Sequence, residues 1–157
     1  IFALVIAIDK YKDPKITSLE GCVNDGDDFV DFLTETLQVP SKQIARLSNE
    51  KATRSEILRR FEEHLISNPD ISRGDALVFF YAGHGDRERA PDGWAASQGD
   101  TIETICPYDV HTTNRNGGVN GIPGRTFDGL MRRLAHEKGD NIVSTLSGIP
   151  ISVLTRH

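Results

Sequence analysis

A single histidine, His84, stands between two glycines shortly after the apolar run Ala76 to Tyr81. An imidazole exchanges protons near neutral pH, so a histidine held at the end of a strand can act first as a general base and then as a general acid. Gly83 and Gly85 leave the backbone free to take positive φ and allow another group to come close. A lone histidine is also common as a structural residue, so this motif alone names no reaction.

Two cysteines, Cys22 and Cys106, lie far apart in the chain and among apolar residues. This usage favours reduced thiols in a cytosolic or nuclear protein over a disulfide framework, and a bridge between them stays an open alternative. Cys22 is expected to be a small packing residue rather than a reactive thiol.

The acidic residues Asp86, Glu88 and Asp92 fall in a polar stretch and are expected to form a solvated loop. The spacing of an EF-hand is not present, so no metal ligand is assigned.

The elements that must position these residues are visible as apolar patterns. Phe2 to Ile8 and Ala76 to Tyr81 have no polar alternation, which is typical of parallel strands covered on both faces. Shorter strands are predicted at Ile44–Leu47, Ile102–Pro107 and Asn141–Leu146. The polar stretches Asp86–Asp100 and Asp109–Gly124 are predicted to be loops, the first with a turn at Pro91–Trp94 that carries an exposed aromatic residue.

Three amphipathic helices are predicted between the strands. In the first, Asn24 and Asp25 offer N-cap chemistry and the helix ends near Gln38. The second begins with the capping box Thr53-Arg54-Ser55-Glu56. The third has Thr126 as its cap and stops at Lys138-Gly139.

The alternation of strands and helices over 157 residues predicts one α/β domain with a mainly parallel sheet, whose carboxyl edge carries the site. The net charge of −5 and the absence of a basic stripe argue against nucleic-acid binding. No run reaches the roughly 20 apolar residues of a membrane span, so no membrane partner is expected. The chain begins without Met, as expected of an excised part of a longer protein.

Four stretches together carry a resemblance to a known family: Ala3–Ile8, Leu19–Asp25, Asp75–Gly85 and Glu103–Asp109. In this order they resemble the large-subunit half of a caspase-like domain, nearest to fungal caspase and metacaspase proteins. The resemblance extends to about Ile142. It implies a caspase-hemoglobinase fold, which is a three-layer α/β sandwich with a mainly parallel sheet, incomplete here at the C-terminus. Residues 1–157 are then one catalytic domain, large-subunit part, with an atypical segment at 143–157.

The resemblance implies cysteine endopeptidase activity and assigns roles to three residues. His84 matches the histidine of the Cys-His dyad, and Gly85 matches the residue whose backbone N–H stabilises the oxyanion. Asp25 matches an acidic residue that binds Arg or Lys before the scissile bond; helix capping is the alternative for it. The implied partners are a peptide or protein substrate and a downstream small-subunit region of the same polypeptide. Calcium is an implied activator without assigned ligands.

The segment after the fourth strand departs from the family. Where the family reads Leu-Asp-Cys-Cys-His-Ser-Gly, this chain has Leu146-Ser147-Gly148-Ile149-Pro150-Ile151-Ser152. The nucleophilic cysteine is therefore absent from its expected position near Ile149, and Ser147 replaces the acidic residue. The hydroxyls of Ser144, Ser147 and Ser152 are poor substitutes because their pKa is much higher than that of a thiol. Cys106 matches a structural position of the family.

Two functional hypotheses follow from the resemblance. The first is a cysteine endopeptidase of which this chain is an inactive portion. The second is a pseudo-peptidase or interaction module that keeps the fold. A nucleotide-binding domain is disfavoured, because Gly83-His84-Gly85-Asp86 has neither dinucleotide-binding nor P-loop spacing. A frameshifted exon end is an alternative to a genuine segment at 143–157. Codons for the family's motif, read in a shifted frame, encode residue pairs that this chain has in the same order: Ser144-Thr145, Ile149-Pro150 and Val153-Leu154.

Overall fold

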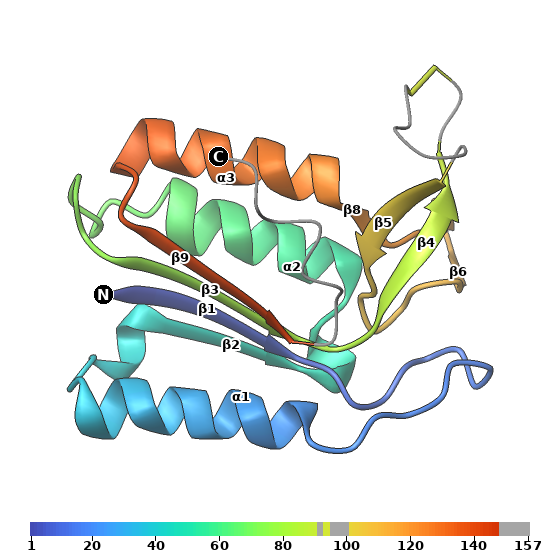
Figure 1. Cartoon of the computed structure of the whole chain (residues 1–157), viewed down its shortest axis with the longest axis horizontal. Helices are drawn as coiled ribbons and strands as arrows, with labels where there is room; N and C mark the ends of the chain where they lie inside the picture. The colour runs from blue at the N-terminus through green and yellow to red at the C-terminus, as the bar shows by residue number, and fades with distance from the viewer. Residues whose placement is uncertain (91–92, 95–100, 148–157) are drawn as a thin grey trace.

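The computed structural model describes residues 1–90, 93–94 and 101–147 (Figure 1). Its centre is a parallel sheet with the strand order β2-β1-β3-β9. The strands are β1 (Phe2–Ala7), β2 (Ile44–Ser48), β3 (Leu77–Ala82) and β9 (Ile142–Ser147). Four of the predicted strands are thereby confirmed.

Helices cover both faces of this sheet (Figure 1). Helix α1 (Cys22–Asp31), which continues as a π-helical segment over Phe32–Thr36, lies on one face. Helices α2 (Arg54–Arg60), continued by a π-helical segment over Phe61–Ile66, and α3 (Gly124–Lys138) lie on the other. The three layers confirm the predicted α/β class with a mainly parallel sheet.

Side chains of β1 and β3 alternate between two apolar cores, which is why both strands read as continuous apolar runs. Leu4 and Phe79 pack with Phe61 and Phe127 on the side of α2 and α3. On the side of α1, Phe80 stacks on Phe29 with ring centroids 4.7 Å apart. Every residue of β1 and β3 is buried, so the sheet is a rigid platform for the loops at its carboxyl edge.

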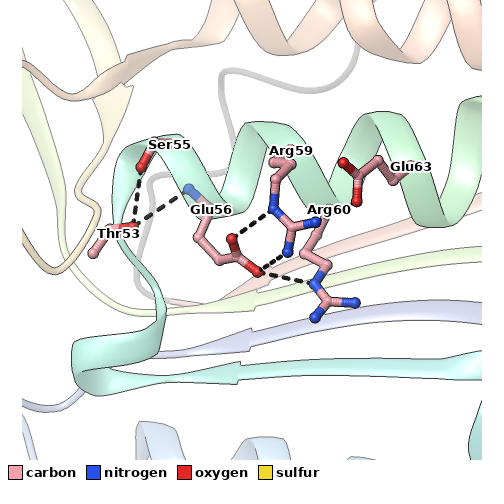
Figure 2. Close-up of polar contacts among 6 residues, drawn as sticks. All are labelled: Thr53, Ser55, Glu56, Arg59, Arg60 and Glu63. Carbon is pink, nitrogen blue, oxygen red and sulfur yellow. Dashed lines mark hydrogen bonds and ion pairs between the residues drawn. The ribbon is translucent and has the colours of Figure 1, made fainter.

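The start of α2 agrees with the predicted capping box at Thr53, whereas the described contacts of the Glu56 carboxylate are with arginines of the helix (Figure 2). Thr53 is the N-cap, and its hydroxyl accepts a hydrogen bond from the backbone N–H of Glu56 at 3.3 Å. The Glu56 carboxylate accepts hydrogen bonds from the guanidinium groups of Arg59 and Arg60, one turn further along. Glu56 therefore links the first two turns of the helix.

The start of α1 differs from the prediction that Asn24 and Asp25 cap it. The helix begins earlier, at Cys22, after Gly21 in a left-handed conformation with φ of 114°. Gly21 has no side chain to offer, and the Asp9 carboxylate, from the loop after β1, accepts from the backbone N–H groups of Cys22 and Val23. A long-range carboxylate thus replaces the local cap.

The start of α3 also differs. Thr126 is not the cap, because the helix begins at Gly124, directly after the short strand β8 (Ile122–Pro123). Pro123 stands at the N-cap with φ of −61° and extended ψ, and its pairing opposite Thr104 fixes where the helix starts. The predicted stop at Gly139 is confirmed, with φ of 99°.

The stretches predicted as loops contain strands. A small antiparallel sheet joins β4 (Gly85–Arg89), β5 (Thr101–Ile105) and β8, and a hairpin joins β6 (Thr113–Asn114) to β7 (Gly117–Gly118). The prediction of a loop from Asp86 onward is therefore wrong for β4, whereas the short strand predicted at Ile102–Pro107 is confirmed as β5. Strand β4 lacks an apolar face, and its pairing with β5 includes an Arg87–Glu103 ion pair that a periodicity pattern does not detect.

Trp94 was expected to be a lone exposed aromatic residue. Its ring is half-buried instead, and the guanidinium carbon of Arg125 lies 5.3 Å from the ring centroid in a cation–π contact. Pro91 and Asp92 of the predicted turn lie outside the described residues. Among the helices described, none combines the length and the apolar character needed to cross a membrane.

Candidate active site at the carboxyl edge of the sheet

His84 lies two residues beyond the end of β3, as predicted. In the register of the sheet the last residue of β3, Ala82, is paired with Ser147, the last residue of β9. The backbone N–H of Gly83 reaches the Ser147 carbonyl at 3.4 Å. Strand β9 therefore ends beside the His84 loop. Ile149, where the nucleophile is expected, lies outside the described residues.

The His84 imidazole is fixed by the loop between β1 and α1. Its Nε2 atom lies 2.8 Å from the backbone oxygen of Thr17. A carbonyl oxygen only accepts, so Nε2 must carry a proton, and in the neutral ring Nδ1 is then the basic nitrogen. Among the contacts of the described residues, this arrangement leaves Nδ1 available to take a proton.

The backbone of His84 is held by two tyrosines. The Tyr11 hydroxyl oxygen accepts the His84 N–H at 2.7 Å, and the Tyr81 hydroxyl donates to the His84 carbonyl at 2.7 Å. Tyr11 is only 9% exposed. Sequence reasoning missed both residues: Tyr11 stands in a polar segment, and Tyr81 was counted only as part of an apolar strand.

The predicted close approach at the glycines is confirmed at Gly83. A Cβ atom there would lie 2.7 Å from the Tyr81 hydroxyl oxygen and 3.0 Å from that of Tyr11. Position 83 therefore needs a glycine because a larger residue would clash with the two hydroxyls, not because of its backbone conformation, since its φ is not positive. Gly85 opens β4 and is exposed.

Asp25 lies in the first turn of α1 and is exposed. Asp9 supplies the hydrogen-bonding cap, whereas Asp25 places a negative charge in the first turn, near the positive end of the helix dipole. The Asp25 side chain also contributes to an open pocket of about 360 Å³ between α1 and the end of β9. The residues that line this pocket are Asp25, Asp28, Phe29, Phe32, Phe80 and Ser147.

Two carboxylates and an aromatic wall are a suitable combination for a cationic side chain, since a cation gains both from ion pairing and from contact with ring faces. Asp28, one turn after Asp25, was not identified from the sequence. The sequence did hold a signal for it: residues three positions apart on a helix lie on the same face, so Asp25 and Asp28 are expected to be neighbours.

Neither cysteine has the character of an activated nucleophile. Burial, followed by the negative charge of Asp9, raises the pKa of the Cys22 thiol to about 11. Burial, followed by the charges of Asp86 and Glu88, raises the pKa of Cys106 to about 12. Both thiols are protonated at neutral pH, in line with the prediction that they are structural.

Asp86, Glu88 and His111 are the described residues that come together as candidate metal ligands. The Nε2 atom of His111 lies 3.5 Å from Asp86 Oδ2 and 3.7 Å from Glu88 Oε1. Asp86 and Glu88 therefore belong to a strand with a defined partner rather than to a solvated loop. Glu88 Oε1 also accepts a hydrogen bond from the Gly121 N–H at 2.7 Å, so contacts within the protein account for the cluster and no metal is assigned to it.

Comparison with known proteins identifies the family. Residues 2–119 match a family model described as "Metacaspase, peptidase C14 domain". The chain is 29% identical over 117 residues to Metacaspase-2 of Arabidopsis thaliana and 31% identical over 99 residues to Metacaspase-1 of the same plant. These alignments cover 71% and 60% of this chain and 26% of each plant protein.

Two further similarities are of other kinds. The aspartate carbamoyltransferase catalytic subunit of Haloquadratum walsbyi is 27% identical over 107 residues, which is 61% of this chain and 34% of that protein. The crystal structure of protein GSU0716 from Geobacter sulfurreducens has a similar fold, with a TM-score of 0.64 at 18% identity over 92% of this chain and 48% of that one. The metacaspase model spans both Asp25 and His84. The chain belongs to the metacaspase, peptidase C14 domain family.

Proposed function

We propose that this chain is the histidine-bearing part of a cysteine endopeptidase that works with a Cys-His dyad. The observation that carries the proposal is the hydrogen bond from His84 Nε2 to the Thr17 carbonyl, which leaves Nδ1 as the basic nitrogen at the edge of the sheet where β9 ends. Family membership supports a peptide or protein as the substrate.

In the reaction proposed for the complete enzyme, Nδ1 of His84 takes the proton of a cysteine thiol at the position after β9 where this chain has Ile149. The thiolate attacks the peptide carbonyl carbon, and the Gly85 N–H stabilises the oxyanion that forms. The imidazolium then gives its proton to the leaving amine nitrogen. Water hydrolyses the thioester, with His84 again acting as the base.

The pocket beside Asp25 supports a preference for Arg or Lys before the scissile bond. Asp25 and Asp28 supply negative charge, and Phe29 and Phe80 supply ring surface next to it. The two carboxylates would repel an acidic side chain, and a purely aliphatic side chain would gain nothing from their charge.

This chain is proposed to be inactive by itself, because Ile149 and Ser147 stand where the family has the thiol and the second acidic residue. Strand β9 forms one edge of the described sheet, and Val143 on it is 55% exposed. Both features are consistent with a downstream small-subunit region that extends the sheet and completes the substrate pocket.

Calcium activation remains only an expectation from the family. The cluster of Asp86, Glu88 and His111 includes an imidazole, whereas calcium prefers oxygen ligands, so the cluster does not fit calcium and no step depends on it.

The second candidate function is a pseudo-peptidase that binds a partner at this edge without chemistry. The observation in its favour is Ser147, which lines the pocket where the family has a carboxylate. A site that keeps His84 and Asp25 but lacks the nucleophile retains the means to bind a basic peptide segment.

Cleavage of a fluorogenic peptide ending in Arg, with and without calcium, tests these alternatives. The chain as it stands is compared with a version in which Leu146–Ser152 is replaced by Leu-Asp-Cys-Cys-His-Ser-Gly and the downstream region of a metacaspase is restored. We expect only the restored protein to cleave, and His84→Ala to abolish that cleavage.

Cleavage by the chain as it stands would refute the assignment of the nucleophile and direct attention to Cys106 or a serine. Failure of both proteins would favour the pseudo-peptidase. The matched control is His136→Ala, which removes an imidazole from the exposed last turn of α3.

A further inference from the structure

We propose that Tyr11, with Tyr81 behind it, is a positioning residue that fixes the ring orientation and the tautomer of His84. This inference rests on the proposed role of His84 as a general base, but its test does not require peptidase activity.

The two hydroxyls bind both polar groups of the His84 backbone. The His84 N–H donates to Tyr11 Oη at 2.7 Å. The Tyr81 hydroxyl points to two acceptors, the carbonyls of His84 at 2.7 Å and of Cys106 at 2.9 Å. Carbonyls only accept, so the single proton of Tyr81 is used there.

The two hydroxyls lie on the same side of the His84 loop. A Cβ atom on Gly83 would be 2.7 Å from the Tyr81 hydroxyl oxygen and 3.0 Å from that of Tyr11. Tyr11 thus holds the His84 N–H and Tyr81 holds the His84 carbonyl. The Cys106 N–H adds a second bond to the same carbonyl at 3.0 Å.

Tyr11 connects the His84 backbone to the imidazole because it shares a loop with Thr17. The loop between β1 and α1 touches His84 twice, through Tyr11 at the backbone and through the Thr17 carbonyl at Nε2. The rings of Tyr11 and His84 also lie in contact, with centroids 5.3 Å apart and planes at 42°. Removing the Tyr11 hydroxyl breaks one of the two contacts that set the distance between Thr17 and the ring.

The rest of the loop is anchored independently of His84. The Lys12 N–H donates to the Tyr108 carbonyl at 2.9 Å, and the backbone N–H groups of Asp9 and Lys10 both reach Asn49 Oδ1. The loop thus keeps its overall path when the Tyr11 hydroxyl is lost, and the change is confined to how His84 sits against it.

The phenols suit this role because they stay neutral. Burial raises the pKa of both the Tyr11 and the Tyr81 hydroxyls above the ordinary value for tyrosine. A neutral phenol both accepts and donates over the whole range in which an imidazole titrates, so both contacts with the His84 backbone are present in both charge states of His84.

The test is ring ¹⁵N NMR of His84 in the 157-residue chain, with the His84 signal assigned by its absence in His84→Gln. In the unmodified chain we expect the Nε2–H tautomer to dominate. Tyr11→Phe keeps the ring and removes the acceptor, so the ratio of the Nδ1–H to the Nε2–H tautomer should rise about fivefold to tenfold, the worth of one hydrogen bond. Tyr108→Phe is the matched control and should leave the ratio unchanged.

His64 serves as the internal check on folding, because its Nε2 lies 3.1 Å from the carbonyls of both Ala3 and Gln43, away from the site. If its signal is lost in Tyr11→Phe, Gly83→Ala disturbs the same hydroxyls from the other side and should shift the His84 ratio in the same direction.

An unchanged tautomer ratio in a folded Tyr11→Phe variant would overturn the proposal. Faster exchange of the His84 amide without a change in that ratio would show that Tyr11 makes a purely structural contact. A dominant Nδ1–H form in the unmodified chain would also overturn it. In the restored peptidase, a positioning role further predicts a lower kcat with little change in KM for Tyr11→Phe. Absence of cleavage in that protein would count against the proposed function and leave the NMR result intact.

Discussion

The Asp9 carboxylate oxygen Oδ1 accepts a hydrogen bond from the backbone N–H of Cys22 at 2.8 Å. The other oxygen of the same carboxylate accepts from Val23 at 3.2 Å. One side chain at the end of β1 therefore satisfies two free N–H groups at the start of α1 and places negative charge at the positive end of the helix. The helix that carries Asp25 is thereby tied to the central sheet.

Replacing Asp9 with Ala should therefore destabilise the protein. We expect the free energy of unfolding to fall by about 1–2 kcal/mol, the usual effect of losing a helix cap. Urea denaturation followed by circular dichroism measures it. Asp70→Ala, at an exposed site in a turn, should change the stability by less than about 0.5 kcal/mol, and equal effects of the two changes would contradict the capping role.

The two thiols should react slowly. With the pKa of Cys22 at about 11 and that of Cys106 at about 12, the thiolate fraction at pH 7.4 is more than ~100-fold below that of an ordinary cysteine. Alkylation by iodoacetamide, followed by mass spectrometry, should proceed in the unfolded chain at the rate of a free thiol and much more slowly in the folded one. Fast labelling of either cysteine in the folded chain would make it a candidate nucleophile.

Two helical glycines should respond to Ala in opposite directions. A Cβ on Gly26 of α1 would lie 2.7 Å from the Cβ of Ala7 on β1, whereas one on Gly129 of α3 would have no neighbour within 4 Å. Gly26→Ala should cost about 1–3 kcal/mol through overpacking. Gly129→Ala should stabilise by up to about 1 kcal/mol through helix propensity. Thermal unfolding of both variants compares them, and a stabilised Gly26→Ala would show that α1 is less closely packed on the sheet.

Glu56 should give α2 a pH-dependent contribution to stability. The hydrogen bond from Arg59, followed by that from Arg60, lowers the pKa of Glu56 from 4.5 to about 2. A depressed pKa in the folded state stabilises the protein above the unfolded pKa, and this stabilisation is lost as the pH falls from about 4.5 to about 2. Because both arginine side chains are more than 40% exposed, solvent screening keeps the effect small.

Glu56→Gln should accordingly be slightly less stable than the unmodified chain at pH 7, and the difference should shrink on acidification. Urea midpoints measured between pH 7 and pH 2.5 test this. A difference that persists unchanged at pH 2.5 would mean that the carboxylate charge is not its cause.

The sequence predicts best the parts of the fold that depend on local pattern. Continuous apolar runs identify β1 and β3, the strand-end glycines locate His84, and the Thr53 cap and the Gly139 stop follow from their immediate neighbours. What the sequence does not predict depends on residues distant in the chain. Asp9 caps α1 from 13 positions earlier, and Tyr11 reaches His84 from 73 positions away.

Strand β4 escapes prediction for a different physical reason. It is held by backbone pairing with β5 and by charged cross-strand contacts, so it needs no apolar face. The place of Asp28 in the pocket is also not predictable from local pattern. The pocket is lined by residues of α1 and by Ser147 of β9, so it exists only once these elements have come together.

The proposed role of Asp25 predicts how substrate preference should change in the restored peptidase described above. Asp25→Asn should lower kcat/KM for a peptide with Arg before the scissile bond by about 10- to 100-fold, because a hydrogen bond to a charged group contributes about 1.5–3 kcal/mol. A peptide with a neutral residue at that place should be affected much less. Asp28→Asn should show the same selectivity with a smaller effect, since it lies one turn further along α1.

The control for both variants is Asp27→Asn. Asp27 is on the same helix, but it forms an ion pair with Arg46 on β2 at 2.5 Å and does not line the pocket. It carries the same charge, so a general change in the field of α1 would lower the Arg-peptide rate equally in Asp27→Asn and Asp25→Asn. If Asp25→Asn loses the Arg preference and Asp27→Asn keeps it, the pocket recognises the Arg side chain. Equal losses in these two variants would identify the overall charge of the helix as the cause.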